Sequence, residues 1–72
     1  MKKLGMLTMR VAKNVTKLRA KSGLGSRELS LAAKLAYCYI SHIETHRKQP
    51  SLDALEALAK VLKVDPVEMF KP

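Results

Sequence analysis

Apolar residues recur at helical spacing in the first part of the chain, at Val11, Val15 and Leu18. Intervals of four and three residues place such side chains on one face of a helix, so we expect a helix over residues 9–21. Thr8 stands where an N-cap would stand. Gly23 supplies the stop, because glycine readily adopts the left-handed conformation that ends many helices.

The middle of the chain carries two shorter helical patterns joined by a turn at residues 34–36. The first pattern spans residues 27–34 and would bury Leu29, Ala32 and Ala33. The second pattern spans residues 37–45. A hydrophobic core could accommodate Leu35 from the turn and Ile40 and Ile43 from this pattern. Four side chains are then left to point elsewhere, and they are the candidates for chemistry: Tyr37, Cys38, Ser41 and His42.

The last third of the chain predicts two further helices. Ser51 is a suitable N-cap, and apolar residues follow it at helical spacing: Leu52, Leu55, Leu58, Ala59 and Leu62. A short fifth helix would start after Asp65 as N-cap, with a proline at its first position, and end at Phe70. There is no strand pattern, so the predicted fold class is all-α.

Charge is distributed unevenly along the 72 residues, whose net charge is +8. Residues 1–48 hold eleven lysines and arginines against two glutamates, whereas residues 49–72 hold three lysines against four carboxylates. The positive field therefore belongs to the first two thirds of the chain, which favours an anionic partner such as nucleic acid. A soluble basic surface is the plainer alternative.

The N-terminal residues 1–7 have the composition of a basic, flexible arm preceding a domain over residues 8–72. The apolar run there is too short for a signal peptide or a membrane span. The single cysteine, Cys38, permits no intrachain disulfide, which is compatible with a reducing cytoplasm. We therefore expect a cytoplasmic protein.

Several short motifs occur together at an uncommon joint spacing: Gly23-Leu24, Glu28-Leu29, Tyr39-Ile40-Ser41, Ile43-Glu44 and Pro50-Ser51-Leu52. With the flanking helices they cover residues 8–70 and resemble the phage-repressor-like (Cro/CI, XRE-type) helix-turn-helix family. The resemblance implies a compact five-helix lambda-repressor-like domain with its helix-turn-helix at about residues 26–45. In this family the third helix enters the DNA major groove and the second lies across the backbone.

The resemblance also assigns roles to individual residues. The base-reading positions are Tyr37, Cys38, Ser41 and His42. The residues expected at DNA phosphates are Ser26, Arg27, Tyr39, Arg47 and Lys48. Arg19 and Glu44 occupy positions that form an ion pair in several relatives, tying the first helix to the end of the third.

The implied function is a sequence-specific transcriptional regulator of the repressor kind, whose partner is double-stranded operator DNA. One half-site is a thin interface, so we expect a homodimer on a palindrome. The expected dimer surface is the apolar C-terminal segment with Val64, Val67, Met69 and Phe70. The alternative is that this segment simply packs onto the first and fourth helices.

Three positions depart from the family pattern. Lys34 replaces a common turn glycine and must adopt a left-handed conformation or alter the turn. Ala36 replaces the Ser or Thr that usually caps the third helix, which removes a cap worth about 1 kcal/mol. Thr45-His46 stands where a glycine commonly follows that helix.

Two other functions stay open. The domain could be an antitoxin-like protein-interaction module that binds DNA secondarily. It could also be a metal or thiol sensor, because Cys38, His42 and His46 recur every four residues, although a fourth ligand is not apparent. We expect no metal and no cofactor. We also expect no catalysis, because the adjacent Ser41 and His42 would face different directions on a helix and no carboxylate is placed to orient them.

Overall fold

The computed structural model describes residues 5–72, and within that range all regular structure is helical. It comprises α1 (Met6–Ser22), α2 (Ser26–Ala32), α3 (Tyr39–Glu44), α4 (Leu52–Leu62) and a 3₁₀ helix, η1 (Pro66–Phe70). The all-α prediction is confirmed. The expected fifth helix is present, but as a single 3₁₀ segment in place of an α-helix. None of the described helices is long and apolar enough to cross a membrane.

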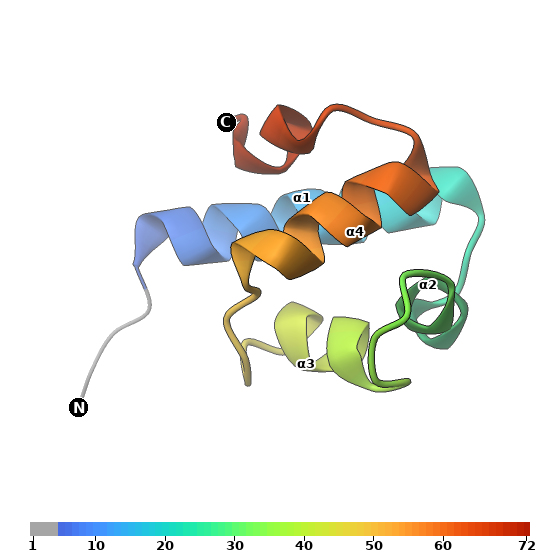
Figure 1. Cartoon of the computed structure of the whole chain (residues 1–72). Coiled ribbons are helices and arrows are strands. Elements are labelled where there is room, and N and C mark those ends of the chain that lie inside the picture. The colour runs from blue at the N-terminus through green and yellow to red at the C-terminus, as the bar shows by residue number, and fades with distance from the viewer. Residues whose placement is uncertain (1–4) are drawn as a thin grey trace.

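Helices α1 and α4 lie one in front of the other in the middle of the molecule (Figure 1). The segment η1 lies on one side of this pair, and α2 and α3 lie on the opposite side. One hydrophobic core joins all five elements, and its fully buried side chains include Val15, Leu29, Ile40, Ile43, Leu58 and Met69. The helix-turn-helix and the C-terminal segment therefore occupy opposite sides of the same core.

Helix α1 starts three residues before the predicted helix. Its N-cap is Gly5 in an extended conformation, so the expectation that Thr8 caps it is wrong, and Thr8 lies in the first turn. Met6 and Leu7, which we expected in a flexible arm, belong to this helix. Residues 1–4 of that arm lie outside the described residues.

The predicted ends of the other helices agree better with the structure. The Ser51 hydroxyl accepts a hydrogen bond from the Ala54 N–H at 3.1 Å, and the Asp65 carboxylate accepts one from the Val67 N–H at 2.9 Å. Gly23 ends α1 with a φ of 83°, as its position predicts. The Glu28 carboxylate accepts a hydrogen bond from the Gly25 N–H at 2.7 Å, which ties down the start of α2.

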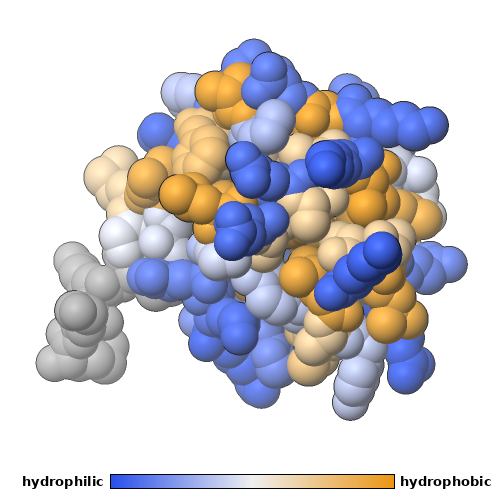
Figure 2. Space-filling model, in the orientation of Figure 1, coloured by the Kyte–Doolittle hydropathy of each residue, from blue (hydrophilic) through white to orange (hydrophobic). Residues whose placement is uncertain are grey.

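Two positions expected in the core are exposed instead. Ala32, the last residue of α2, is exposed, whereas Leu29 and Ala33 are buried as expected. Leu52 is 72% exposed although its spacing is correct, whereas Ala54 and Leu55 in the same turn of α4 are buried. On the side of the molecule where α4 lies in front of α1, the surface shows apolar residues with hydrophilic residues between them (Figure 2).

Met69 differs in the opposite sense, because we expected it on a dimer surface. It is 0% exposed and belongs to the core, so that assignment is wrong. The Asn14 side-chain amide donates hydrogen bonds to the carbonyls of Met69 at 2.8 Å and Lys71 at 2.7 Å. These two bonds tie the C-terminal segment to α1, beside the buried Met69 side chain.

Candidate nucleic-acid interface

The turn between α2 and α3 is built without glycine. Lys34 has a φ of 60°, so it takes the left-handed option that the sequence left open. Its N–H bonds the Leu31 carbonyl at 3.0 Å, and the Leu35 N–H bonds the Ser30 carbonyl at 2.9 Å. This pair of hydrogen bonds is a Schellman motif, which satisfies the last carbonyls of α2. The chain is thereby reversed toward α3.

Helix α3 starts at Tyr39, two residues later than predicted, and Tyr37 and Cys38 form the turn before it. It has no capping side chain of its own, as expected from Ala36. Instead Ser30, a fully buried residue of α2, accepts a hydrogen bond from the Ile40 N–H at 3.1 Å. The same hydroxyl donates to the Ser26 carbonyl at 2.8 Å. Ser30 therefore joins the two helices of the motif directly.

One face of α3 is buried and the other is open. Ile40 and Ile43 are 0% and 1% exposed and fix the helix on the core. Tyr37 is 60% exposed and Ser41 is exposed, while Cys38 and His42 are partly exposed. Two of the four predicted base-reading residues thus precede α3 and two lie within it, and none of the four is buried in the core.

Cationic side chains flank this open surface on both sides. The Arg27 guanidinium lies 5.0 Å from the centroid of the Tyr37 ring, and the Lys48 ammonium lies 5.3 Å from that of Tyr39. Such contacts hold a flexible cation over an aromatic face and are worth about 0.5–1 kcal/mol at exposed sites. The Tyr39 hydroxyl accepts a hydrogen bond from the Ser51 N–H at 3.3 Å, which connects α3 to the start of α4.

The basic loop after α3 is tied back onto the helix. His46 has a φ of 62° and takes the place of the missing glycine. The N–H groups of Arg47 and Lys48 both donate to the His42 carbonyl, at 2.8 and 3.3 Å. Both side chains are exposed. Two cationic residues therefore follow the C-terminal end of α3, opposite the turn with Tyr37 that precedes its N-terminal end.

The expected ion pair between Arg19 and Glu44 forms. The Arg19 Nε lies 2.7 Å from Glu44 Oε2, and Nη2 lies 3.4 Å from Oε1. The remaining guanidinium nitrogen, Nη1, donates to the Leu24 carbonyl at 3.2 Å. The two side chains are 22% and 18% exposed, so the pair is largely shielded from water. It fixes the end of α3 against α1 and the chain between α1 and α2.

Cys38, His42 and His46 do not share one helix. Cys38 precedes α3, and His46 follows it in a left-handed conformation, so the regular spacing in sequence does not give aligned side chains. Within residues 5–72 there is no group of three or more His, Cys, Asp or Glu side chains that could hold a metal ion.

Sequence reasoning did not anticipate the polar roles of Ser30 and Asn14. Neither residue belongs to a motif in the sequence, and Asn14 lies one residue before the buried Val15. Both roles depend on backbone groups distant in sequence, by 10 residues for Ser30 and by 55 and 57 for Asn14. A local pattern carries no signal of such contacts.

Comparison with solved structures places this fold among transcription regulators. A hypothetical transcription factor, NHTF, from Neisseria superposes with a TM-score of 0.87 at 25% identity, over 100% of this chain and 86% of that one. The restriction-modification controller protein C.AhdI from Aeromonas hydrophila gives a TM-score of 0.81 at 25% identity, over 88% and 96%. The controller C.Esp1396I, bound to a 25 base pair operator site, gives 0.82 at 28% identity, over 93% and 88%.

Comparison with curated protein sequences gives no match. Residues 15–69, by contrast, match the family model described as helix-turn-helix, and this range contains α2, the turn, α3, α4 and nearly all of η1. The match covers well over half of the chain. The chain therefore belongs to the XRE-type helix-turn-helix family of DNA-binding transcription regulators.

Proposed function

We propose that the protein is a sequence-specific regulator that inserts α3 into the major groove of double-stranded DNA and binds its operator as a homodimer. The observation that carries this proposal is the open face of α3, which has a cation held over a tyrosine on each side. The similar controller C.Esp1396I is bound to a 25 base pair operator site, which supports operator DNA as the partner.

Base recognition is assigned to Tyr37, Cys38, Ser41 and His42. The Tyr37 ring can contact a thymine methyl group, the Ser41 hydroxyl can bond to several bases, and His42 can donate to guanine N7 or O6. The long polar side chains that give strong bidentate contacts are missing from this surface. We therefore expect modest discrimination at each base pair.

Phosphate contacts are assigned to Ser26, Arg27, Tyr39, Arg47 and Lys48. Arg27 and Lys48 are the strongest candidates, because their cation–π contacts reduce the side-chain freedom that binding would otherwise remove. The Tyr39 hydroxyl already accepts one hydrogen bond, and its proton remains available to a phosphate oxygen. Affinity should fall steeply with salt, since each phosphate that is neutralised releases counterions.

The dimer surface is assigned to Val64, Val67 and Phe70, without Met69. Val67 is 52% exposed, and its two neighbours in this set are partly exposed. Val67→Glu should shift the protein toward monomer in sedimentation equilibrium and weaken operator binding. Leu31→Glu is a matched control, because Leu31 is a similarly exposed apolar residue on α2. An unchanged molecular mass for Val67→Glu would remove this surface from the proposal.

The proposal is tested by selecting binding sites from random duplex DNA. We expect a recurrent motif of two inverted half-sites, about one helical turn apart from centre to centre, with roughly 4–6 specified base pairs in each. Enrichment of a single unrepeated half-site would retain α3 as the reading helix and refute the dimer. A pool without any enriched motif would refute sequence-specific binding altogether.

A further inference from the structure

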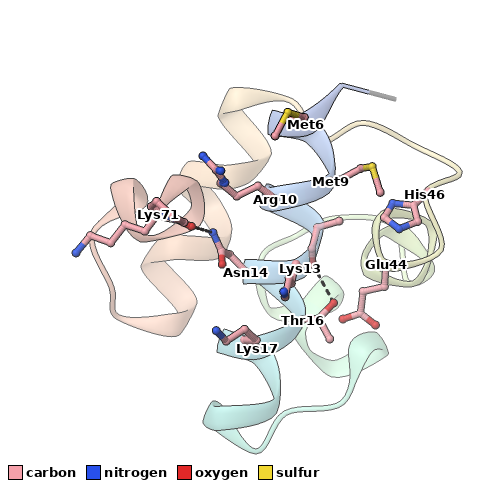
Figure 3. A pocket seen from close by; sticks show the side chains of 12 residues that line it. Met6, Met9, Arg10, Lys13, Asn14, Thr16, Lys17, Glu44, His46 and Lys71 are labelled. Atoms are coloured by element: carbon pink, nitrogen blue, oxygen red, sulfur yellow. Dashed lines mark hydrogen bonds between the residues drawn. The ribbon is translucent and has the colours of Figure 1, made fainter. Parts of the chain in front are cut away.

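The outer side of α1 carries a second basic surface, in a groove of about 640 Å³. Figure 3 shows Arg10, Lys13 and Lys17 projecting from α1 along this groove, with Glu44 and His46 on one side and Lys71 on the other. Arg10, Lys13 and Lys17 follow at intervals of three and four residues, which places them on one face of the helix. None of the residues assigned to DNA lines this groove.

These three cations have no acidic partners in the described part of the chain. Between residues 5 and 72 the ion pairs are Arg19–Glu44 and Lys71–Glu68. The carboxylate that reaches the groove, Glu44, is thus already neutralised by Arg19. Arg10, Lys13 and Lys17 therefore leave uncompensated positive charge at this surface.

The N-terminal end of the same groove is apolar and exposed. Met6 is 80% exposed and Met9 is 49% exposed, and both line the groove beside Arg10. Methionine side chains are flexible and polarizable, so they adapt to different apolar partners. A DNA backbone offers nothing apolar to bury them, whereas an amphipathic peptide offers both carboxylates and apolar side chains.

We propose that this groove, which we name the α1 groove, is a docking site for an acidic amphipathic helix of a partner protein. The carboxylates of the partner face Arg10, Lys13 and Lys17, and its apolar side chains cover Met6 and Met9. The groove meets α3 only at its last residue, Glu44, and none of the base-reading side chains lines it. The protein can therefore hold DNA and this partner at the same time. The inference does not depend on the DNA-reading role proposed above.

The test uses a fluorescein-labelled synthetic helical peptide as the probe. Leucine occupies every third or fourth position of the peptide, and glutamate occupies the flanking positions. Fluorescence anisotropy with the whole protein should give saturable binding. A control peptide with glutamine in place of every glutamate should bind at least about tenfold more weakly, because only the charge has changed.

Variants of the protein then locate the site. Lys13→Glu combined with Lys17→Glu should weaken peptide binding at least about tenfold. Lys21→Glu combined with Lys60→Glu changes the net charge equally at two exposed positions outside the α1 groove and should change binding less than threefold. Met9→Ser should weaken binding about threefold or more, since it removes apolar contact.

Three outcomes would overturn the proposal. Equal weakening by both double variants would mean that net charge alone attracts the peptide. In the second outcome, duplex DNA displaces the peptide, and the Lys13/Lys17 variant loses as much DNA affinity as Arg47→Ala does. The groove would then be part of the DNA-binding surface. A change of oligomeric state in the Lys13/Lys17 variant, measured by sedimentation, would mean that a second copy of the chain occupies it.

Discussion

The hydroxyl of Ser30 is the structural link within the helix-turn-helix, and its removal is a sharp test of the fold. Ser30→Ala deletes the group that accepts a hydrogen bond from the Ile40 N–H at 3.1 Å and donates to the Ser26 carbonyl at 2.8 Å. Both Ser30 and Ile40 are 0% exposed, so water cannot easily replace the lost acceptor. The substitution therefore leaves a backbone donor buried without a partner at the start of α3.

The magnitude follows from two opposing terms. An unsatisfied buried donor costs about 1–3 kcal/mol. Alanine has a higher helix propensity than serine, which offsets this cost by up to about 0.5 kcal/mol. The net expectation is a loss of about 1–2 kcal/mol in the free energy of unfolding. In a domain of this size that corresponds to a fall in Tm of about 4–8 °C for each kcal/mol.

The measurement is urea unfolding followed by circular dichroism, with Ser41→Ala as the control. Ser41 is an exposed serine on α3, so its replacement should change the free energy of unfolding by less than about 0.5 kcal/mol. A loss below 0.5 kcal/mol for Ser30→Ala would show that the Ile40 N–H finds another partner. The account of how α3 is capped would then be wrong.

Three further substitutions test other contacts by the same unfolding assay. Asn14→Ala removes both hydrogen bonds to the C-terminal carbonyls and should cost about 1–2 kcal/mol, and a loss near zero would show that the Met69 packing alone holds η1. Lys63 ends α4 with a φ of 59°, so Lys63→Gly should stabilise the fold by up to about 1 kcal/mol, whereas Lys60→Gly inside the helix should destabilise it by about 1 kcal/mol, and equal effects would contradict this. A double-mutant cycle with Arg19→Ala and Glu44→Ala should give a coupling of about 1 kcal/mol, because the pair is mostly shielded from water, and additive effects would refute the role of this pair.

The helices were predictable because their signals are local. Apolar spacing predicted α1 to α4, whereas η1 was predicted from Asp65 as N-cap and the proline that follows it. The caps at Ser51 and Asp65 followed from residue type and position alone. The ion pair of Arg19 with Glu44 links residues 25 positions apart, and it was accessible only through the family resemblance. The start of α1 was misplaced because Gly5 caps it through backbone conformation, without a side-chain signal.

The errors arose where tertiary contacts override a local pattern. Met69 belongs to an apolar terminal segment that we expected to face a partner, with packing onto the core as the alternative, and the structure buries its side chain while Asn14 binds the carbonyls of Met69 and Lys71. Ala36 correctly predicted a missing cap, but the compensating group, Ser30, lies in the preceding helix. Such substitutes depend on how two helices pack, which residue spacing within one helix does not specify.

The central claim, that α3 reads DNA sequence while its basic flanks supply affinity, is tested most directly by comparing one operator with its scrambled duplex. The measurement is fluorescence anisotropy across a salt series for the wild type, Tyr37→Ala, His42→Ala and Arg47→Ala. The wild type should prefer the operator by at least about 10³-fold. Tyr37→Ala and His42→Ala should each reduce that preference by about tenfold. Arg47→Ala should weaken both duplexes equally and lower the salt slope by about 1. A preference that survives both Tyr37→Ala and His42→Ala unchanged would contradict the account.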